Sequence, residues 1–401
     1  MRILCVADEF PWPPTSGYRI RLETTLAGLA DVGDVDLFCS IAERADVADG
    51  EHPPPPGVAR LFVHRRDRYR ATPRGLARWA SSRMPRAVAW IDWRNAGAAL
   101  ERWAPDDYDL VWFSHCHSWA GIPRARGEAT IVDFDNLEDE KLRSLLTLRR
   151  LRRLEGSSRP TPRSRLGALL DRLDVGRWRR LQQRAAARSK AVVVCSEADR
   201  VRVGAANAVV VPNGYPDEVL DRVAALSPVL TMVGLMTYPP NEDGARFFAT
   251  QVFPLVRDAE PTATFRIVGR DDGLLADLEA APGVERMGEV ADVGCVLADT
   301  SAVVVPLRAG SGTRVKILEA FARGLPVIAT TLGCEGLDAH DGKELLIADT
   351  PDELAEACLT ILRRPETAAR IAAAGHALWE SRYRPTTIQA QVAEIARSLQ
   401  G

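Results

Sequence analysis

Three charged side chains follow a small turn near the end of the sequence. In PLRAGSGTRVKILEAFARGLPVIAT, residues 306–330, a glycine–serine–glycine turn leads into a helical pattern that opens with Arg314 and Lys316 and continues to Glu319. Such a turn lets backbone N–H groups approach an anion, and the first turn of a helix favours negative charge. A glycine turn alone is a weak signal, but two cations beside it predict an anion site, in particular one for a diphosphate.

Glu319 requires a separate explanation, because a carboxylate rarely helps a phosphate site. It could pair with Lys316 three residues earlier, which is worth only about 0.2–0.5 kcal/mol on an exposed helix. It could instead accept two hydrogen bonds from the vicinal hydroxyls of a sugar. Cations for a diphosphate and a carboxylate for a ribose together predict a nucleotide diphosphate.

These side chains need a strand that ends at the turn and a helix that begins after it, and such alternation runs through the whole chain. Apolar runs that predict strands occur at residues 2–8, 35–40, 110–114, 130–135, 191–196, 208–213, 229–234, 264–269, 302–307, 326–331 and 344–349. Strands buried on both faces and separated by helices predict parallel α/β sheets. The pattern pauses at 214–228, which predicts two successive doubly wound domains. Ligands of such sheets bind beyond the carboxyl ends of the strands, here at the cleft between the domains.

The composition of the 401 residues excludes several classes of protein. With 52 basic and 54 acidic residues, the chain is not expected to bind nucleic acid. The seven cysteines are scattered singly, without metal-ligand spacing, so they predict buried thiols in a reducing compartment. Met1 leads directly into a strand pattern, without a signal peptide or membrane span, so a cytoplasmic enzyme is expected.

The stretch LEAFARGLPVIAT resembles GT-B glycosyltransferases of the retaining glycosyltransferase family 4, also called glycosyl transferases group 1. That family has a Glu-x7-Glu pattern here, whose second Glu contacts the ribose and corresponds to Glu319. Ser311 stands where the first Glu would be, which puts a carboxylate role there in doubt. The family often draws phosphate-binding cations from the loop after the first strand of its second domain. That loop, residues 234–244, has none, and Arg314 and Lys316 supply the charge instead.

Segments resembling the family extend over nearly the whole chain, at 196–200, 210–216, 265–272 and 283–293. The resemblance implies a GT-B architecture of two Rossmann-like domains facing an interdomain cleft. The expected division is an acceptor domain at 1–214, a linker at 215–228, a nucleotide-sugar domain at 229–380 and a helix at 381–401 that crosses back to the first domain. The donor-binding residues that it implies are Gly17, Gly234, Gly269, Arg286, Gly288, Gly310, Ser311, Gly312, Thr313 and Glu319.

The first domain is expected to bind the acceptor. Aromatic faces stack on sugars, so Trp12, Tyr18 and Trp119 are acceptor candidates, together with Arg19. Gly17 could approach the donor diphosphate, or Ser16 could simply cap the helix that starts there.

His115 and His117 follow the strand at 110–114, where this fold has an acceptor loop, and His117 is slightly favoured for catalysis. Neither has metal-type partners nearby in sequence, so no metal site is predicted. Carboxylates clustered at 133–140 could bind a metal, but acids at a helix N-terminus are the simpler interpretation.

The expected activity is transfer of a sugar from a UDP-, GDP- or dTDP-sugar to an acceptor hydroxyl or amine. Arg314 and Lys316 would stabilise the leaving diphosphate. The resemblance implies retention of the anomeric configuration, and no cofactor is required. The alternatives are a nucleotide-sugar epimerase, an inverting transferase with His115 or His117 as base, and a non-catalytic sugar-nucleotide-binding protein.

An arginine-rich excursion at 141–190 interrupts the first domain. It could contact an anionic membrane, which would place the enzyme at the inner membrane face, since each basic residue near such a surface contributes about 1 kcal/mol. It could equally be a solvated helical segment. The acceptor, a small molecule, glycolipid or glycan, and the oligomeric state are left open by the sequence.

Overall fold

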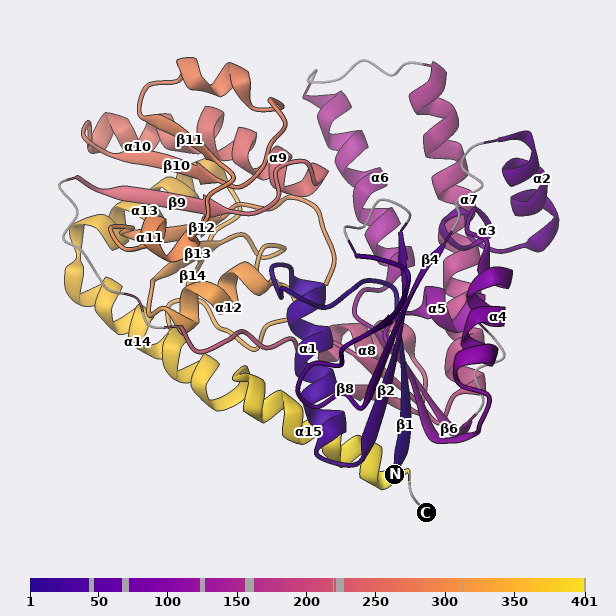
Figure 1. Cartoon of the computed structure of the whole chain (residues 1–401). Helices are drawn as coiled ribbons and strands as arrows, with labels where there is room; N and C mark the ends of the chain where they lie inside the picture. Colours follow the sequence, from indigo (N-terminus) through magenta and orange to yellow (C-terminus); the bar gives the residue numbers. More distant parts are fainter. Residues whose placement is uncertain are drawn as a thin grey trace. The chain divides into compact units, whose positions relative to one another are not determined.

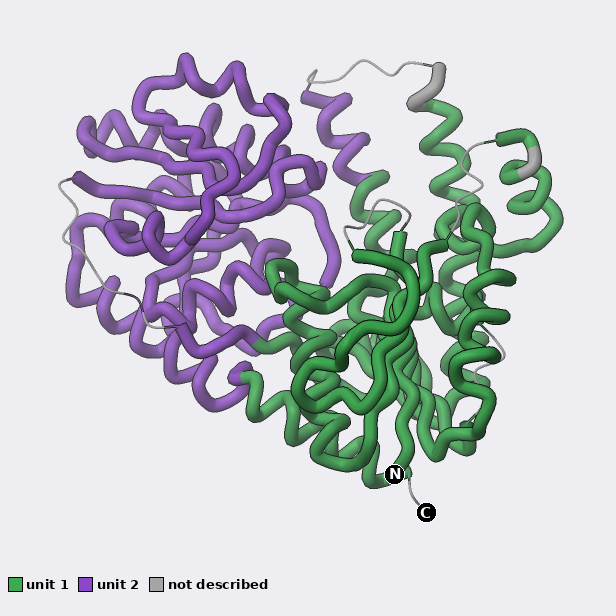
Figure 2. Tube along the Cα trace, in the orientation of Figure 1, with its two compact units in different colours: residues 1–146, 158–214, 385–401 green, residues 147–157, 215–384 purple. Residues whose placement is uncertain are grey.

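The chain folds as two α/β units, each built around its own sheet (Figure 1). The structure, a computed structural model, describes all residues except 43–46, 67–71, 123–126, 156–161, 219, 221–226, 313 and 400–401. Unit 1 comprises residues 1–146, 158–214 and 385–401, and unit 2 comprises residues 147–157 and 215–384 (Figure 2). The predicted donor residue Thr313 lies outside the described residues.

The sheet of unit 1 has the strand order β3-β4-β2-β1-β5-β6-β7-β8. Its strands are β1 (Arg2–Ala7), β2 (Asp34–Ala42), β3 (Gly50–His52), β4 (Arg60–Arg66), β5 (Tyr108–Phe113), β6 (Gly127–Phe134), β7 (Ala191–Val194) and β8 (Ala208–Val210). All pair in parallel except β3, which is antiparallel to β4. β1 and β5 are neighbours at the centre, so the segments that follow them, which carry Asp8 and His115, lie at the same edge of the sheet.

Helices cover both faces of this sheet (Figure 1). They are α1 (Gly17–Ala30), α2 (Pro73–Ser82), α3 (Arg86–Ala89), α4 (Trp93–Trp103), α5 (Cys116–Gly121), the first part of α6 (Glu138–Leu154), α7 (Pro162–Arg188), α8 (Glu197–Val203) and α15 (Pro385–Ser398). Alternate residues of β1 enter the two cores: Leu4 packs with α4, α5 and α7, and Ile3 with α1 and α15. This period of two, with both sets apolar, is what a sheet buried on both faces requires.

The sheet of unit 2 has the strand order β11-β10-β9-β12-β13-β14, and every pair is parallel. Its strands are β9 (Val229–Val233), β10 (Thr264–Val268), β11 (Val284–Gly288), β12 (Ala302–Val305), β13 (Val327–Ala329) and β14 (Leu346–Ile347). Its helices are α9 (Pro239–Phe247), the π-helical turn η1 (Phe248–Val252), α10 (Phe253–Ala259), the 3-10 helix η2 (Ala276–Ala280), α11 (Val293–Leu297), α12 (Val315–Ala322), α13 (Pro351–Arg363) and α14 (Pro365–Arg382).

The end of α6 belongs to unit 2, although the helix begins in unit 1. Arg152 Nε donates to Asp243 on α9 at 3.0 Å, and its Nη2 donates to Glu242. Glu155 accepts from Arg308, whose Nε also donates to Asp243 at 3.0 Å. Arg308 lies in the loop after β12, so the helix end is tied to the segment that carries the glycine turn.

The predicted fold class, with two doubly wound parallel sheets, is confirmed. The sequence pattern overlooked β3, β4 and β11, because none of them has more than three apolar residues in a row: their sequences are GEH, RLFVHRR and VERMG. The last helix, α15, begins at Pro385 and belongs to unit 1, and the arginine-rich segment 141–190 is largely the two helices α6 and α7. The predicted domain bounds stay a prediction.

Candidate functional site

The glycine turn and the first turn of α12 hold Arg314 and Lys316 as expected from a strand–turn–helix junction. The guanidinium of Arg314 is 7% exposed and donates to the carbonyl oxygens of Ser311 at 2.5 Å and Leu332 at 3.4 Å. Gly310 has a φ of +138°, and a Cβ there would lie 2.7 Å from Nη2 of Arg314. The arginine therefore packs directly on the backbone of the turn, which only glycine permits.

Lys316 turns toward the start of the loop after β9. Its Nζ donates to Asn241 Oδ1 at 2.8 Å and lies 2.8 Å from the position that a Cβ of Gly234 would occupy. Among the described residues it makes no ion pair with a carboxylate. Burial, and then the charge of Arg314, lower the pKa of Lys316 to about 7. The charge of Glu319 opposes this shift only in part, so an ammonium group here is favoured by a bound anion.

Glu319 does not pair with Lys316, so the i, i+3 interpretation is wrong. Its Oε1 accepts from Tyr215 Oη at 2.8 Å and from Arg323 Nη2 at 3.4 Å. Burial raises the pKa of Glu319, although the hydrogen bond from Tyr215 and the charge of Arg323 oppose that effect. Its Oε2 has no hydrogen-bond partner within the described part of the chain, which leaves an acceptor for a ligand hydroxyl.

The other predicted donor residues of unit 2 lie at the carboxyl ends of its strands. Gly234 follows β9, Gly269 follows β10 and Gly288 ends β11. Gly269 has a φ of +124°, and a Cβ there would lie 1.9 Å from the carbonyl oxygen of Gly234, so these two strand ends meet at their backbones. The Arg286 side chain does not point to a donor role, because its guanidinium pairs with Asp271 and Glu279. A nucleotide base would therefore have to contact the backbone of this segment.

Ser311 supplies a further polar atom at the turn. Its Oγ is buried and has no hydrogen-bond partner among the residues that the structure describes. A buried hydroxyl without a partner is unfavourable by about 1–3 kcal/mol, so a ligand or water that bonds to it would be stabilised.

In unit 1, His115 lies between two carboxylates that come from different strands. Its Nδ1 is 3.3 Å from Asp8 Oδ2, and its Nε2 is 3.8 Å from Asp135 Oδ2. Burial disfavours the imidazolium, but hydrogen bonds and charges from Asp135 and Asp8 outweigh it and raise the pKa of His115 to about 10. Despite burial, His115 in turn lowers the pKa of Asp8 and of Asp135 to about 2. His115 is therefore a cation at neutral pH and does not accept a proton.

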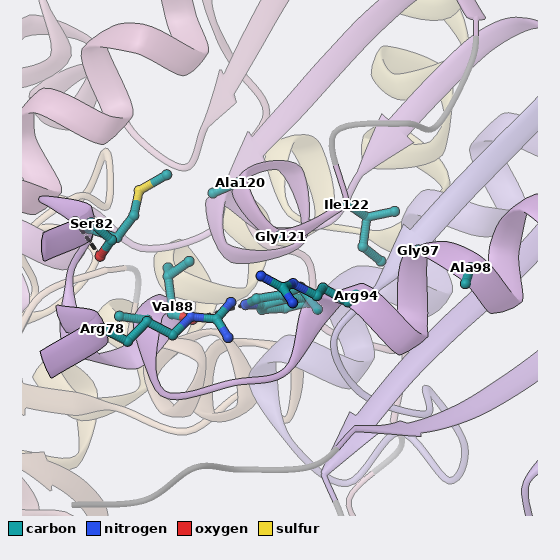
Figure 3. A pocket seen from close by; sticks show the side chains of 12 residues that line it. Arg78, Ser82, Val88, Arg94, Gly97, Ala98, Ala120, Gly121 and Ile122 are labelled. Carbon is teal, nitrogen blue, oxygen red and sulfur yellow. Dashed lines mark hydrogen bonds between the residues drawn. The ribbon is translucent and has the colours of Figure 1, made fainter. Parts of the chain in front are cut away.

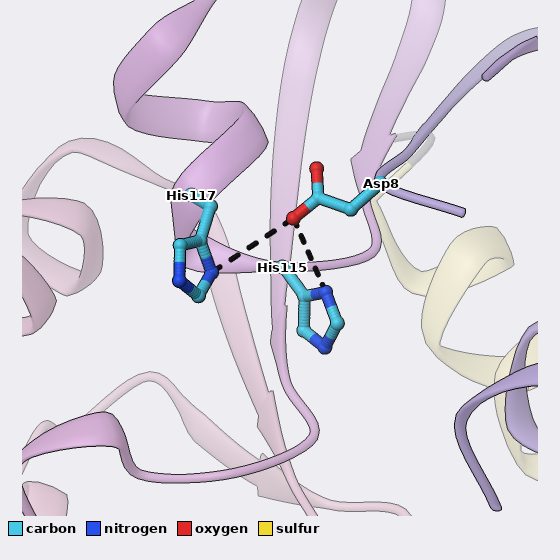
Figure 4. A group of neighbouring side chains, drawn as sticks. All are labelled: Asp8, His115 and His117. Atoms are coloured by element: carbon cyan, nitrogen blue, oxygen red, sulfur yellow. Dashed lines mark ion pairs between the residues drawn. The ribbon is translucent and has the colours of Figure 1, made fainter. Parts of the chain in front are cut away.

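His117 differs from His115 in its charge. Its Nδ1 lies 3.8 Å from the same Asp8 oxygen, and its ring packs edge-on against Trp178. Burial lowers the pKa of His117, so this imidazole is neutral. The structure brings both candidate histidines together and adds Asp8, which lies more than a hundred residues away in sequence (Figure 4).

A buried arginine holds the carboxylates behind the histidines. Arg21 on α1 donates to both oxygens of Asp133, at 2.8 and 2.7 Å, and to Asn213 Oδ1 at 2.8 Å. Asp135 accepts from the same asparagine at 3.5 Å. The acids at Glu138, Asp139 and Glu140 do occupy the first turn of α6, but Asp133 and Asp135 belong to this network instead.

The predicted acceptor residues are mostly engaged with other protein groups. The Tyr18 ring stacks on His115 at 4.3 Å, and its hydroxyl bonds to Ser114 at 2.7 Å, so it positions the histidine. Trp12 donates to Glu23 at 3.1 Å, and Arg19 pairs with Glu9 at 3.6 Å.

The last acceptor candidate and the predicted helix start have structural partners too. Trp119 packs against one core of unit 1. Ser16 caps α1 by accepting from the N–H of Arg19, next to Gly17. This is the alternative that the sequence left open for that turn, and a role of Gly17 toward a diphosphate stays a prediction.

Unit 1 also has a pocket of about 570 Å³ that contains none of the predicted acceptor residues. It lies between α2, α3, α4 and α5 and is lined by Arg78, Ser82, Met84, Val88, Ala89, Trp93, Arg94, Gly97, Ala98, Ala120, Gly121 and Ile122. In Figure 3 the side chains of Arg78 and Arg94 extend toward the same part of the pocket. Its lining is apolar apart from these two arginines and Ser82.

Residues 227–364 match the family described as glycosyl transferases group 1. This matched stretch contains the sheet of unit 2 and the donor-site residues of that unit except Tyr215. A curated relative, an uncharacterised 44.6 kDa protein in the cps region of Klebsiella pneumoniae, is 25% identical over 132 residues; the match covers 29% of this chain and 32% of that protein, about a third of its length.

Solved structures match the whole chain at low identity and show its fold. Sucrose-phosphate synthase of Thermosynechococcus elongatus has a TM-score of 0.69 at 16% identity, covering 100% of this chain and 99% of that one. Anabaena HepE in complex with UDP and glucose has a TM-score of 0.65 at 15% identity, with 99% and 100% covered. WaaG, a glycosyltransferase involved in lipopolysaccharide biosynthesis, has a TM-score of 0.61 at 15% identity, with 100% of both chains covered. The chain therefore has the GT-B fold that its motifs predicted.

Several residues of these sites could not be found from the sequence. Tyr215 holds Glu319 from 104 residues away, and Asn241 holds Lys316 from 75 residues away. Asp8 and Asp135 flank His115 from the ends of two other strands. The sequence signal that could have found the two aspartates is their place at the end of a predicted strand. Side chains from several strands converge at that end of a parallel sheet.

Proposed function

We propose that the protein transfers a sugar from a nucleotide diphosphate sugar to an acceptor hydroxyl or amine. The observation that carries this proposal is the pair of cations at the glycine turn, the buried Arg314 and the partly buried Lys316, in a stretch that matches the glycosyl transferases group 1 family. Ser311 Oγ and the second carboxylate oxygen of Glu319, which bonds to none of the described residues, complete a set of groups suited to a diphosphate and a ribose.

We favour a uridine nucleotide as donor, because HepE, which shares the fold, has been solved with UDP and with UDP-glucose. GDP- and dTDP-sugars are the other candidates. The backbone of the segment from Arg286 to Gly288 would receive the base, since the Arg286 side chain is held by Asp271 and Glu279.

In the proposed reaction, the bond between the anomeric carbon and the diphosphate oxygen breaks, and the acceptor oxygen or nitrogen forms the new bond. Charge grows on the leaving diphosphate, and cations already fixed beside it stabilise that charge without reorganisation. We propose that these side chains make a metal ion unnecessary at the diphosphate. With retention, a leaving-group oxygen takes the acceptor proton on the same face of the sugar.

The state of His115 bears on the inverting alternative. An inverting transferase needs a general base, and a histidine with a pKa of about 10 already carries its proton. His117 is neutral, but its ring is packed against Trp178. Retention is therefore the outcome that we propose.

We also propose that unit 1 contacts an anionic membrane surface, such as the inner face of the cytoplasmic membrane. On α7, Leu166, Leu169 and Leu173 are 57%, 52% and 49% exposed, and their spacing places them on one helix face. Arg165 and Arg172 are exposed beside them. In the described part of the chain no helix is long and apolar enough to cross a membrane.

The proposed function is tested by calorimetric titration with UDP, GDP, dTDP and ADP. One nucleotide should bind well, and the Arg314→Ala/Lys316→Ala double variant should lose most of that affinity, while the exposed-lysine control Lys343→Ala should retain it. Absence of nucleotide binding in the folded wild type would overturn the proposal.

Product analysis separates the alternatives. With the matching nucleotide sugar and a mixture of acceptors, NMR should show a product with unchanged anomeric configuration. An inverted product would identify an inverting transferase, and conversion of the donor without acceptor would identify an epimerase. Binding without any product would leave the non-catalytic alternative.

A further inference from the structure

Three potential metal ligands converge where β1 and β5 end (Figure 4). They are Asp8 Oδ2, His115 Nδ1 and His117 Nδ1, and all three atoms lie within 4.8 Å of one another. The Asp8 oxygen is 3.3 Å from the nitrogen of His115 and 3.8 Å from that of His117. In Figure 4 both imidazole rings direct Nδ1 toward this one oxygen.

We infer that Asp8, His115 and His117 form a binding site for a divalent transition-metal ion of the Zn²⁺ type. Two imidazole nitrogens and one carboxylate oxygen are ligands that zinc and its neighbours in the first transition row prefer. The proposed transfer reaction does not require this ion, so the inference goes beyond the proposed function.

The size of the triangle fits such an ion. In the plane of the three atoms, the point equidistant from them lies no more than about 2.4 Å from each, whereas Zn²⁺ prefers about 2.0–2.2 Å to these ligands. Side-chain movements of a few tenths of an ångström would close the difference. Main-chain movement is unnecessary.

The surroundings of the ligands also fit. Metal-bound histidines usually donate their second ring N–H to a carboxylate, and Nε2 of His115 faces Asp135 at 3.8 Å. Asp135 is itself held by Asn213, so the His115 ring has a fixed orientation. Nδ1 of His117 is buried without a hydrogen-bond partner among the described residues, so this nitrogen is available to coordinate a metal ion.

Nearby charges do not exclude a cation. Arg66 Nη1 lies 3.5 Å from Oδ1 of Asp8, which is the oxygen that the proposed ion does not use. Lys141 is paired with Glu138 at 3.2 Å, so that this lysine is neutralised close to His117. Asp133 is paired with Arg21. A metal-bound imidazole nitrogen carries no proton, so the ion would displace the proton that His115 holds on Nδ1 in the metal-free protein, and its binding should weaken as pH falls.

Three protein ligands leave at least one coordination position open. A structural zinc site is usually closed by four protein ligands, and an open position typically binds water or substrate. In unit 1, the unit proposed for acceptor binding, the open position suits an oxygen of the acceptor, such as a hydroxyl or a phosphate.

The test uses the full-length protein, treated with a chelator and dialysed, and titrated with Co²⁺ as a coloured substitute for Zn²⁺. We expect one equivalent of Co²⁺ to produce visible absorption bands, and Zn²⁺ to abolish them. His117→Gln removes a ligand, so affinity should fall by more than the roughly 10- to 100-fold that loss of an outer partner causes. Asp135→Asn should produce a loss within that smaller range, and His340→Gln, at an exposed histidine, should produce none.

Two results would overturn the inference. One is absence of cobalt bands from wild-type protein whose circular dichroism shows that it is folded. The other is equal binding by wild type and His117→Gln, which would indicate an adventitious site elsewhere. If His117→Gln does not fold, ¹⁵N spectra of histidine-labelled wild type decide: zinc should shift two of the six histidine Nδ1 signals, and unchanged signals would contradict the site.

Discussion

Lys316 provides the most direct test of the proposed donor site, because its charge depends on pH near neutrality. Its pKa is about 7 in the free protein, so the ammonium form is lost as pH rises above that value. A bound diphosphate would stabilise the ammonium and raise the pKa of Lys316. Nucleotide binding should therefore take up a proton, and affinity should fall as pH increases.

The size of the effect follows from the pKa. The value of about 7 is about 3.5 below the usual 10.5, and each pKa unit corresponds to about 1.4 kcal/mol. If binding restored the usual value completely, proton uptake would contribute about 5 kcal/mol, which is an upper limit. Well above pH 7 the affinity would fall almost tenfold for each pH unit, since one proton must be bound with each nucleotide.

The assay is calorimetric titration of UDP between pH 7.5 and 8.5, where the terminal phosphate, with a pKa of about 6, is already ionised. Affinity should fall by nearly tenfold across this range. Repeating the titration in buffers with different ionisation enthalpies counts the protons taken up, and close to one per nucleotide is expected at pH 8.5.

Lys316→Met should bind UDP more weakly at pH 7.5, with no proton uptake and no fall in affinity toward pH 8.5. Lys343→Met removes an exposed lysine from the same unit and should behave as wild type. A wild type that binds UDP equally at both pH values would refute the reasoning, as would a pH dependence that persists in Lys316→Met.

Three further predictions concern side chains around the two sites. Glu319→Gln should weaken UDP binding by about 1.5–3 kcal/mol and leave pyrophosphate binding unchanged in calorimetry, because a charged acceptor for the ribose is lost; equal losses for both ligands would argue against a ribose contact. Gly310→Ala should lower UDP affinity at a cost of about 1–3 kcal/mol, since its φ of +138° and the adjacent Arg314 leave no room for a methyl group; unchanged affinity would contradict that packing. Arg21→Met should destabilise the protein by about 3–5 kcal/mol in urea unfolding, because it leaves Asp133 buried without its partner; a loss below about 1 kcal/mol would show that water reaches the carboxylate.

Much of the fold was predictable because buried parallel strands form continuous apolar runs. The run at 302–307, for example, contains β12, whose four residues are all buried. β4 was not predicted, since RLFVHRR has only three apolar residues in a row, followed by a histidine and two arginines, and lies next to the short antiparallel edge strand β3. An apolar pattern therefore overlooks a strand whose apolar run is this short.

The site was only partly predictable for a related reason. Arg314, Lys316 and Glu319 lie within six residues, so one segment of sequence displays them together. Asn241, which orients Lys316, and Tyr215, which holds Glu319, reach the site through the tertiary fold.

Asp8 is the same kind of case in unit 1. Its contact with His115 depends on β1 and β5 being neighbours in the sheet, and the local sequence does not determine the order of the strands.

The division of α6 between the two units affects how this protein could be recombined with others of its fold. A fragment cut only at the unit boundaries near 215 and 384 would take the main part of unit 2. Such a fragment would lack residues 147–157 and would leave Asp243 and Arg308 without Arg152 and Glu155. Arg308 belongs to the loop that continues into the glycine turn. A chimera with a foreign α6 would therefore keep every donor residue but lose the ion pairs that fix this loop to α6.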